Sequence, residues 1–243
     1  MKLTEKAIAY FIENNEADCI EKIKDFENFH QKYFIAKHKP QPEKPESLLG
    51  QNGLHFIQMC LYRSYLLFDG YIDSINNNNE LSGAVCIRAH FETTAATAYF
   101  SKKLRSYYDG KIDFEELDAF LERLLLGIKT KGELERAPDP VNVLTMIKSV
   151  DDQINEINNT GISGFMNTYD LLSEFCHPNS FGLQIAGDIN KVGVVRYKPF
   201  EKPFNINLYF TKNFLMSSSA FMLFYLRVRN LLEAKEDLPI IIS

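Results

Sequence analysis

Apolar residues recur at intervals of three and four positions along most of this chain, and this spacing constrains the fold more than any other feature. Such a period places apolar side chains on one face of an α-helix. The sequence therefore predicts a mostly α-helical protein, a multi-helix bundle of about seven helices. We expect helices over residues 4–38 (with a break near 14–15), 54–75, 81–107, 113–131, 140–157, 163–177 and 206–234.

One segment departs from the helical period. Phe181, Leu183 and Ile185 alternate with smaller or polar residues, and β-branched residues resume after the turn sequence DINK. Alternation of this kind predicts one inserted β-hairpin near residues 181–198, which we expect to hold the only substantial strand content. An isolated hairpin is not stable in water, so it must lie on the bundle or pair with a second copy in a homodimer.

The sequence KPQPEKPE interrupts the helical pattern early in the chain. Three prolines separated by charged or polar residues exclude the interior of a helix or sheet. We therefore divide the chain into an N-terminal helical segment (1–38), a proline-rich linker (39–47) and a helical bundle with the hairpin (48–243). The three parts are expected to form one domain overall.

Charge and composition exclude some classes of protein. The net charge is −5, whereas proteins that bind nucleic acid generally carry an excess of Lys and Arg. The feature that most resembles a basic patch consists of Lys102, Lys103 and Arg105. These residues lie at a predicted helix end, where cations complement the helix dipole. A hydrophobic content of 45% supplies a core and argues against a disordered chain.

The chain shows no sign of export or membrane insertion. Its N-terminus reaches Glu13 and Glu16 before an apolar signal region can form, and its most apolar stretch, 214–226, is shorter than the roughly 20 residues of a membrane helix. The four cysteines are widely separated and lack a Cys-x-x-Cys pair. We expect a cytoplasmic protein with no membrane contact, disulfide, structural metal or cofactor.

Two charged residues interrupt the predicted buried face of the helix over 81–107, namely Arg88 and Glu92. That face otherwise contains Leu81, Ala84, Val85, Ala95, Ala96 and Tyr99. A buried charge is costly unless it is paired, and Arg preceding Glu is the weaker order for a pair within one helix. We therefore expect each to have a further partner. The neighbouring His90 is expected at a solvated position.

The segment YDLLSEFCHPNSFG supplies candidate partners. Tyr169, Ser173 and His177 are spaced four residues apart and share a helix face. His177 lies at the helix C-terminus, where the dipole favours its protonated form and suits it to Glu92. We expect at least two of Arg88, Glu92 and His177 to lie within hydrogen-bond reach. All five residues are ligand-binding candidates, and those three are also catalytic candidates.

The segments CIRAHFETTAATAYF and YDLLSEFCHPN resemble a family of bacterial all-helical proteins without an assigned activity. That family combines Arg-x-x-x-Glu on one helix with Ser-x-x-x-His-Pro at the end of another, and the resemblance covers residues 54–182. It is distantly similar to the HEPN helical bundles, several of which are metal-independent ribonucleases or toxins of defence systems. HEPN enzymes use an Arg followed four to six residues later by a His. No Arg precedes His177 at that distance, so the resemblance implies the fold more than the activity.

A metal site is the remaining alternative. The motif Glu-x-x-His occurs at Glu27/His30 and at Glu174/His177, and di-metal helical bundles combine two such motifs with two further glutamates. Glu92 is a candidate for one of the additional carboxylates.

Three functions thus stay open. The first is a binding or interaction module whose Arg88–Glu92–His177 network is structural or receives a small anionic ligand. The second is a HEPN-like metal-independent ribonuclease, with RNA as its partner. The third is a di-metal carboxylate protein. Bound iron or manganese would identify the third, and RNA cleavage in the presence of EDTA would identify the second.

Overall fold

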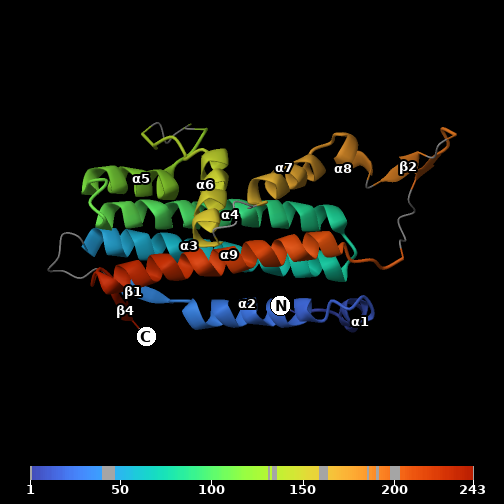
Figure 1. Cartoon of the computed structure of the whole chain (residues 1–243), viewed down its shortest axis with the longest axis horizontal. Helices are drawn as coiled ribbons and strands as arrows, with labels where there is room; N and C mark the ends of the chain where they lie inside the picture. The colour runs from blue at the N-terminus through green and yellow to red at the C-terminus, as the bar shows by residue number, and fades with distance from the viewer. Residues whose placement is uncertain are drawn as a thin grey trace.

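A computed structural model describes residues 2–39, 47–130, 132, 136–158, 164–184, 186–189, 192–197 and 203–242. Within these ranges the chain is a helical bundle with two small β-ribbons, which confirms the predicted fold class (Figure 1). The helices are α1 (Glu5–Glu13), α2 (Asp18–Tyr33), α3 (Ser47–Asn76), α4 (Glu80–Tyr108), α5 (Phe114–Leu126), α6 (Val143–Asn158), α7 (Phe165–Cys176), α8 (Ser180–Gln184) and α9 (Leu208–Ala234). The strands are β1 (Lys37–Lys39), β2 (Gly187–Ile189), β3 (Val195–Tyr197) and β4 (Ile240–Ile242).

Helix α4 is the central element of the bundle. It packs against α3 and α9 along its length and against α5, α6 and α7 on its other side (Figure 1). Small buried residues allow this close packing, including Gly83, Ala84, Ala95 and Ala98. Because several faces are covered, the predicted single buried stripe was partly wrong: Leu81 and Val85 are exposed, whereas Ile87, His90 and Phe91 are fully buried.

The N-terminal segment is docked on the bundle. Helix α2 packs against α9 and α3, and the buried His30 imidazole hydrogen-bonds the Leu61 carbonyl oxygen of α3 through Nε2 at 2.9 Å. The predicted break near residues 14–15 is confirmed, since α1 ends before Asn15, whose φ is +59°. Most of the proline-rich linker, residues 40–46, lies outside the described ranges.

Asparagine and other short polar side chains set several helix ends. The side chains of Thr4, Asn79, Asp113 and Asn207 accept the amide hydrogen of the residue three positions later. The asparagine run ends α3 at Asn76 and forms the predicted turn to α4 over residues 77–79. The expected helix start at Pro140 was wrong, because Asn142 Oδ1 accepts the amide hydrogens of Leu144 and Thr145 and starts α6 later.

The inserted hairpin is confirmed, but it is shorter than its alternating pattern indicated. Asn179 Oδ1 accepts the amide hydrogens of Phe181 and Gly182 and nucleates α8 where the first strand was expected. Strands β2 and β3 pair antiparallel and extend with α8 beyond the end of the bundle (Figure 1). The hairpin therefore stands away from the bundle, and its pairing with a second copy stays a prediction.

The expectation that strands occur only in this hairpin was wrong. Strand β1 pairs antiparallel with β4, with Lys37 opposite Ile242 and Lys39 opposite Ile240. The three consecutive isoleucines of β4 have high β-propensity, and their pairing ties the C-terminus to the segment that follows α2. The four cysteines are unpaired thiols. None of the described helices has the length and apolar character needed to cross a bilayer.

Candidate functional site

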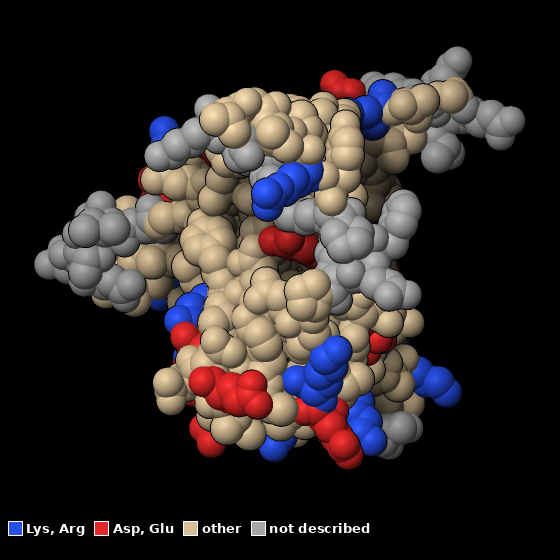
Figure 2. All heavy atoms as spheres, turned by 90° about the vertical axis from the view of Figure 1, so that its right-hand side faces the viewer, with Lys and Arg blue, Asp and Glu red and all other residues tan. Residues whose placement is uncertain are grey.

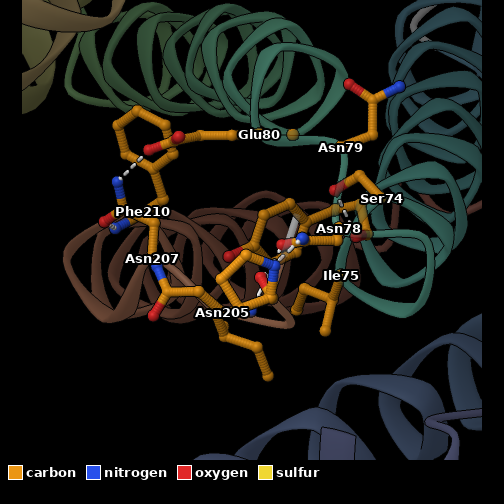
Figure 3. A pocket seen from close by; sticks show the side chains of 12 residues that line it. Ser74, Ile75, Asn78, Asn79, Glu80, Asn205, Asn207 and Phe210 are labelled. Carbon is orange, nitrogen blue, oxygen red and sulfur yellow. Dashed lines mark hydrogen bonds between the residues drawn. The ribbon is translucent and has the colours of Figure 1, made fainter. Parts of the chain in front are cut away.

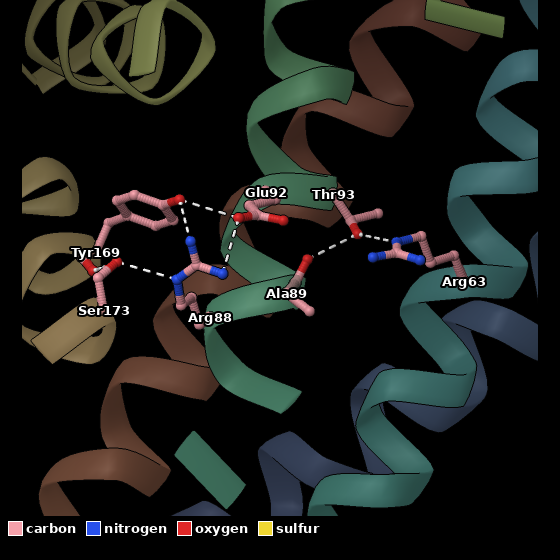
Figure 4. A network of polar contacts seen from close by, with 7 residues as sticks. All are labelled: Arg63, Arg88, Ala89, Glu92, Thr93, Tyr169 and Ser173. Carbon is pink, nitrogen blue, oxygen red and sulfur yellow. Dashed lines mark hydrogen bonds and ion pairs between the residues drawn. The ribbon is translucent and has the colours of Figure 1, made fainter. Parts of the chain in front are cut away.

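The structure brings four of the five predicted site residues together where α7 packs on α4 (Figure 4). Arg88 donates from Nε to Ser173 Oγ at 3.0 Å and from Nη2 to Tyr169 Oη at 2.9 Å. Its Nη1 lies 3.2 Å from Glu92 Oε1, one turn along α4. Tyr169 Oη donates to the same Glu92 oxygen at 2.9 Å. The four side chains therefore form a closed network.

This network uses each nitrogen of the Arg88 guanidinium within the chain. The Arg88 and Glu92 side chains are 32% and 29% exposed, so both charges are partly buried. Burial, and then the hydrogen bond to Glu92, raises the pKa of the Tyr169 hydroxyl and keeps it protonated as a donor. The network therefore holds α7 against α4. A ligand at Arg88 would have to replace at least one of these contacts.

His177 lies outside the network. Helix α7 ends at Cys176, and His177 is extended (ψ 149°) because a residue before proline disfavours the helical conformation. Its side chain is exposed and makes no hydrogen bond or ion pair within the described part of the chain. The prediction that two of Arg88, Glu92 and His177 lie within reach is confirmed by the first two. The pairing of His177 with Glu92 was wrong, and Tyr169 occupies that place.

His90 was predicted to be solvated and is instead fully buried between three helices. Its Nε2 lies 2.7 Å from Ser64 Oγ on α3, and its Nδ1 lies 2.8 Å from Ser217 Oγ on α9. Burial lowers its pKa to about 3, with smaller contributions from the charges of His30 and Arg63. His90 is therefore a neutral buried residue that links α4 to α3 and α9.

The residues of the proposed di-metal site do not converge. The pair Glu27/His30 lies on α2 and the pair Glu174/His177 at α7, on opposite sides of the α4 and α9 layer (Figure 1). Both ring nitrogens of His30 are already 2.9 Å from backbone carbonyl oxygens. A separate group, Glu16, Asp18 and Cys19, has metal-ligand spacing, but Glu16 and Asp18 each pair with a lysine and the thiol is buried.

A cavity of about 410 Å³ opens at the end of the bundle where α4 and α9 begin (Figure 3). Figure 2 faces this end of the bundle and shows acidic atoms recessed below the surrounding surface. The lining acid is Glu80, which accepts a hydrogen bond from Asn207 Nδ2 at 2.6 Å. Asn78 donates to the Pro203 carbonyl oxygen and accepts from the Asn205 amide. These asparagines join the α3–α4 turn to the segment entering α9.

A second cavity, of about 300 Å³, lies where α6 crosses α4 and α9. Its lining combines two arginines with neutral polar side chains and one leucine: Ser101, Arg105, Gln153, Arg227, Asn230 and Leu231. Ser101 and Gln153 are buried. The Gln153 amide nitrogen is fixed by the carbonyl oxygens of Ala98 and Ser149, at 3.0 and 3.2 Å.

The charges of this arginine pocket (the six residues above) are incompletely balanced. Arg105 lies 3.6 Å from Glu156, and both side chains are more than half exposed, so this pair is weak. Arg227 is half-buried and has no ion pair or hydrogen bond within the described ranges. Burial and then the charge of Arg105 lower the pKa of Arg227. Two cations thus share one partly desolvated pocket.

Comparison with known proteins adds no assignment, because no family model, curated protein or solved structure matches this chain. Sequence reasoning missed the arginine pocket. It assigned Arg105 to a helix dipole, and Arg227 and Gln153 are too distant in the chain to form a motif with it. Only the packing of α6 across α4 and α9 brings these residues together.

The Arg88 network predicts that two substitutions change the free energy of unfolding by different amounts. Glu92→Ala leaves a partly buried guanidinium without its counter-charge, and we expect it to lower the free energy of unfolding by about 1–3 kcal/mol. His177→Ala removes an exposed side chain, and we expect a change of less than about 0.5 kcal/mol. Urea denaturation of both variants measures the difference. An equal or larger loss for His177→Ala would contradict this assignment.

Burial of neutral His90 predicts loss of stability in acid. Since the unfolded imidazole has a pKa of about 6.5 and the folded one a pKa of about 3, only the unfolded state gains this proton as the pH falls through that window. Protonation of His90 in the unfolded state should therefore lower the free energy of unfolding by about 1 kcal/mol for each pH unit of acidification. In the His90→Gln variant, the free energy of unfolding should fall less steeply with pH by this amount. Urea denaturation between neutral and acidic pH measures that slope. NMR provides a check on the folded wild type, where titration of the His90 ring near neutral pH would contradict the assignment.

Proposed function

We propose that this protein is a helical binding module for a small molecule bearing an oxyanion group, such as a phosphate or carboxylate, and that the arginine pocket is its binding site. The observation that carries the proposal is the half-buried Arg227 guanidinium, which lines the pocket with Arg105 and lies over the Phe224 ring. Among the described residues it has no ion pair, and the more distant charge of Glu156 offsets its burial and the charge of Arg105 only in part. A bound anion would pair with both cations and remove the repulsion between them.

The Arg88 network is less suited to this role. Its guanidinium already contacts Ser173, Tyr169 and Glu92, so an anion there would compete with an internal carboxylate. Competition is weaker in the arginine pocket, because Glu156, which pairs with Arg105 at 3.6 Å, is mostly exposed and does not line the pocket. The ribonuclease and di-metal hypotheses remain predictions, and no contact among the described residues favours them.

The lining indicates the class of ligand. Arginine presents planar pairs of donors that match the oxygen atoms of phosphate and carboxylate groups. Asn230 adds an amide group, and Leu231 adds an apolar contact at the wall of the pocket. A volume of about 300 Å³ is at the lower end of the range for small-molecule sites. We therefore expect a compact ligand with one anionic group rather than an extended polyanion.

The proposal predicts saturable binding of inorganic phosphate that depends on Arg227. Arg227→Gln removes one charge-assisted contact, and we expect it to weaken binding about 10- to 100-fold. Isothermal titration calorimetry with phosphate, repeated with sulfate and acetate, measures the affinity and the preferred geometry of the anion.

Arg229→Gln is the matched control. Arg229 lies on the same helix, is also half-buried and also lies over an aromatic ring, that of Tyr33, but it does not line the pocket. We expect this variant to bind phosphate as the wild type does. Equal weakening by both substitutions would indicate a general charge effect, and an absence of binding by the wild type to all three anions would refute the proposal.

A further inference from the structure

The outward face of α3 carries an apolar seam that nothing in the described chain covers. Met59, Tyr62 and Leu66 are 49%, 56% and 50% exposed. Their spacing of three and four residues places them on one stripe, opposite the buried face of the same helix that contains Leu61 and Phe68. An exposed apolar stripe with this period is the pattern by which one helix packs against another.

Polar residues continue the seam at both ends, and the two ends differ in chemistry. Asp69 and Asp73 extend the stripe toward the C-terminus of α3. His55 extends it toward the N-terminus, where its ring lies 6.3 Å from that of His38 in β1. The exposed Lys37 and Lys39 flank His38 in that strand. Burial, and then the neighbouring His55, lower the pKa of His38, so the positive charge at this end comes from the two lysines. The seam therefore has an acidic end, an apolar centre and an end with two imidazoles and two lysines.

This order of charges is self-complementary only when two identical seams run antiparallel. A two-fold axis near Tyr62 places Met59 close to the partner's Leu66, because these residues flank the centre on opposite sides. His55 and Asp69 are equally far from Tyr62 along the chain, so His55 would face the partner's Asp69. A parallel arrangement would instead place each of Asp69 and Asp73 against the same residue of the second copy, and these like charges repel.

We propose that the protein forms a homodimer in which α3 packs antiparallel against α3 of a second copy. Such an interface is isologous and closes on itself, so it leads to a dimer and not to open polymers. The arginine pocket is formed by α4, α6 and α9, so the dimer and the anion site are independent proposals.

Sedimentation equilibrium of the full chain tests the dimer. The wild type should show twice the 28.0 kDa chain mass. Leu66→Asp places a charge in the seam and should raise the dissociation constant at least about tenfold. Leu144→Asp is the matched control, since Leu144 on α6 has the same 50% exposure and lies outside the seam. A monomeric wild type, or equal dissociation by both variants, would overturn the proposal.

Cysteine cross-linking tests the orientation. Tyr62→Cys lies at the two-fold axis and should form a disulfide between subunits under mild oxidation. Asp73→Cys lies far from the axis and should not, whereas a parallel dimer would cross-link at both positions. The wild type measures the background from the native thiols, of which Cys19 and Cys60 are buried. Cross-linking of Asp73→Cys, or of neither variant, would contradict the antiparallel arrangement.

Discussion

The burial of α4 on several sides is the constraint on which the rest of the structure depends. A polar group removed from water costs free energy unless it finds a partner, and the polar side chains of α4 find theirs on other helices. His90 contacts Ser64 on α3 and Ser217 on α9. Arg88 contacts Tyr169 and Ser173 on α7. Each contact specifies which helix packs there and in which register.

The same requirement explains why the binding site is expected elsewhere. Along the middle of α4 the polar groups are satisfied within the chain, so a ligand would have to break contacts that hold helices together. Near its C-terminal end, at Arg105, α6 and α9 bring Arg227 and neutral amides, and the ion pair found there among the described residues is the exposed one between Arg105 and Glu156. The internal charge balance is incomplete there, and an external anion can complete it.

Local patterns in the sequence predicted much of the fold. Apolar periodicity located the long helices, and the asparagine run located the α3–α4 turn. The sequence also predicted that Arg88 and Glu92 each have a partner beyond one another, and Tyr169 on α7 contacts both. The assumption of one buried stripe failed for α4, since a helix with neighbours on several sides buries more than one face. That is why His90 was placed in solvent.

Features that depend on distant parts of the chain were not predictable. The pairing of β1 with β4 joins residues near the two ends of the sequence, and the arginine pocket joins residues from α4, α6 and α9. The role of His177 was misjudged because Pro178 ends α7 one residue early and turns the backbone out of the helix. A one-residue shift at a helix end is enough to remove a side chain from a network.

The central claim is that Arg88 is committed to internal contacts while Arg227 and Arg105 are available to an anion. NMR of the arginine Nε–H groups during a phosphate titration tests it most directly, because it observes all these side chains in one sample. The account predicts saturable shifts of the Arg227 and Arg105 signals, with the Arg88 signal unmoved. Shifts confined to Arg88, or signals that do not respond at all, would contradict it.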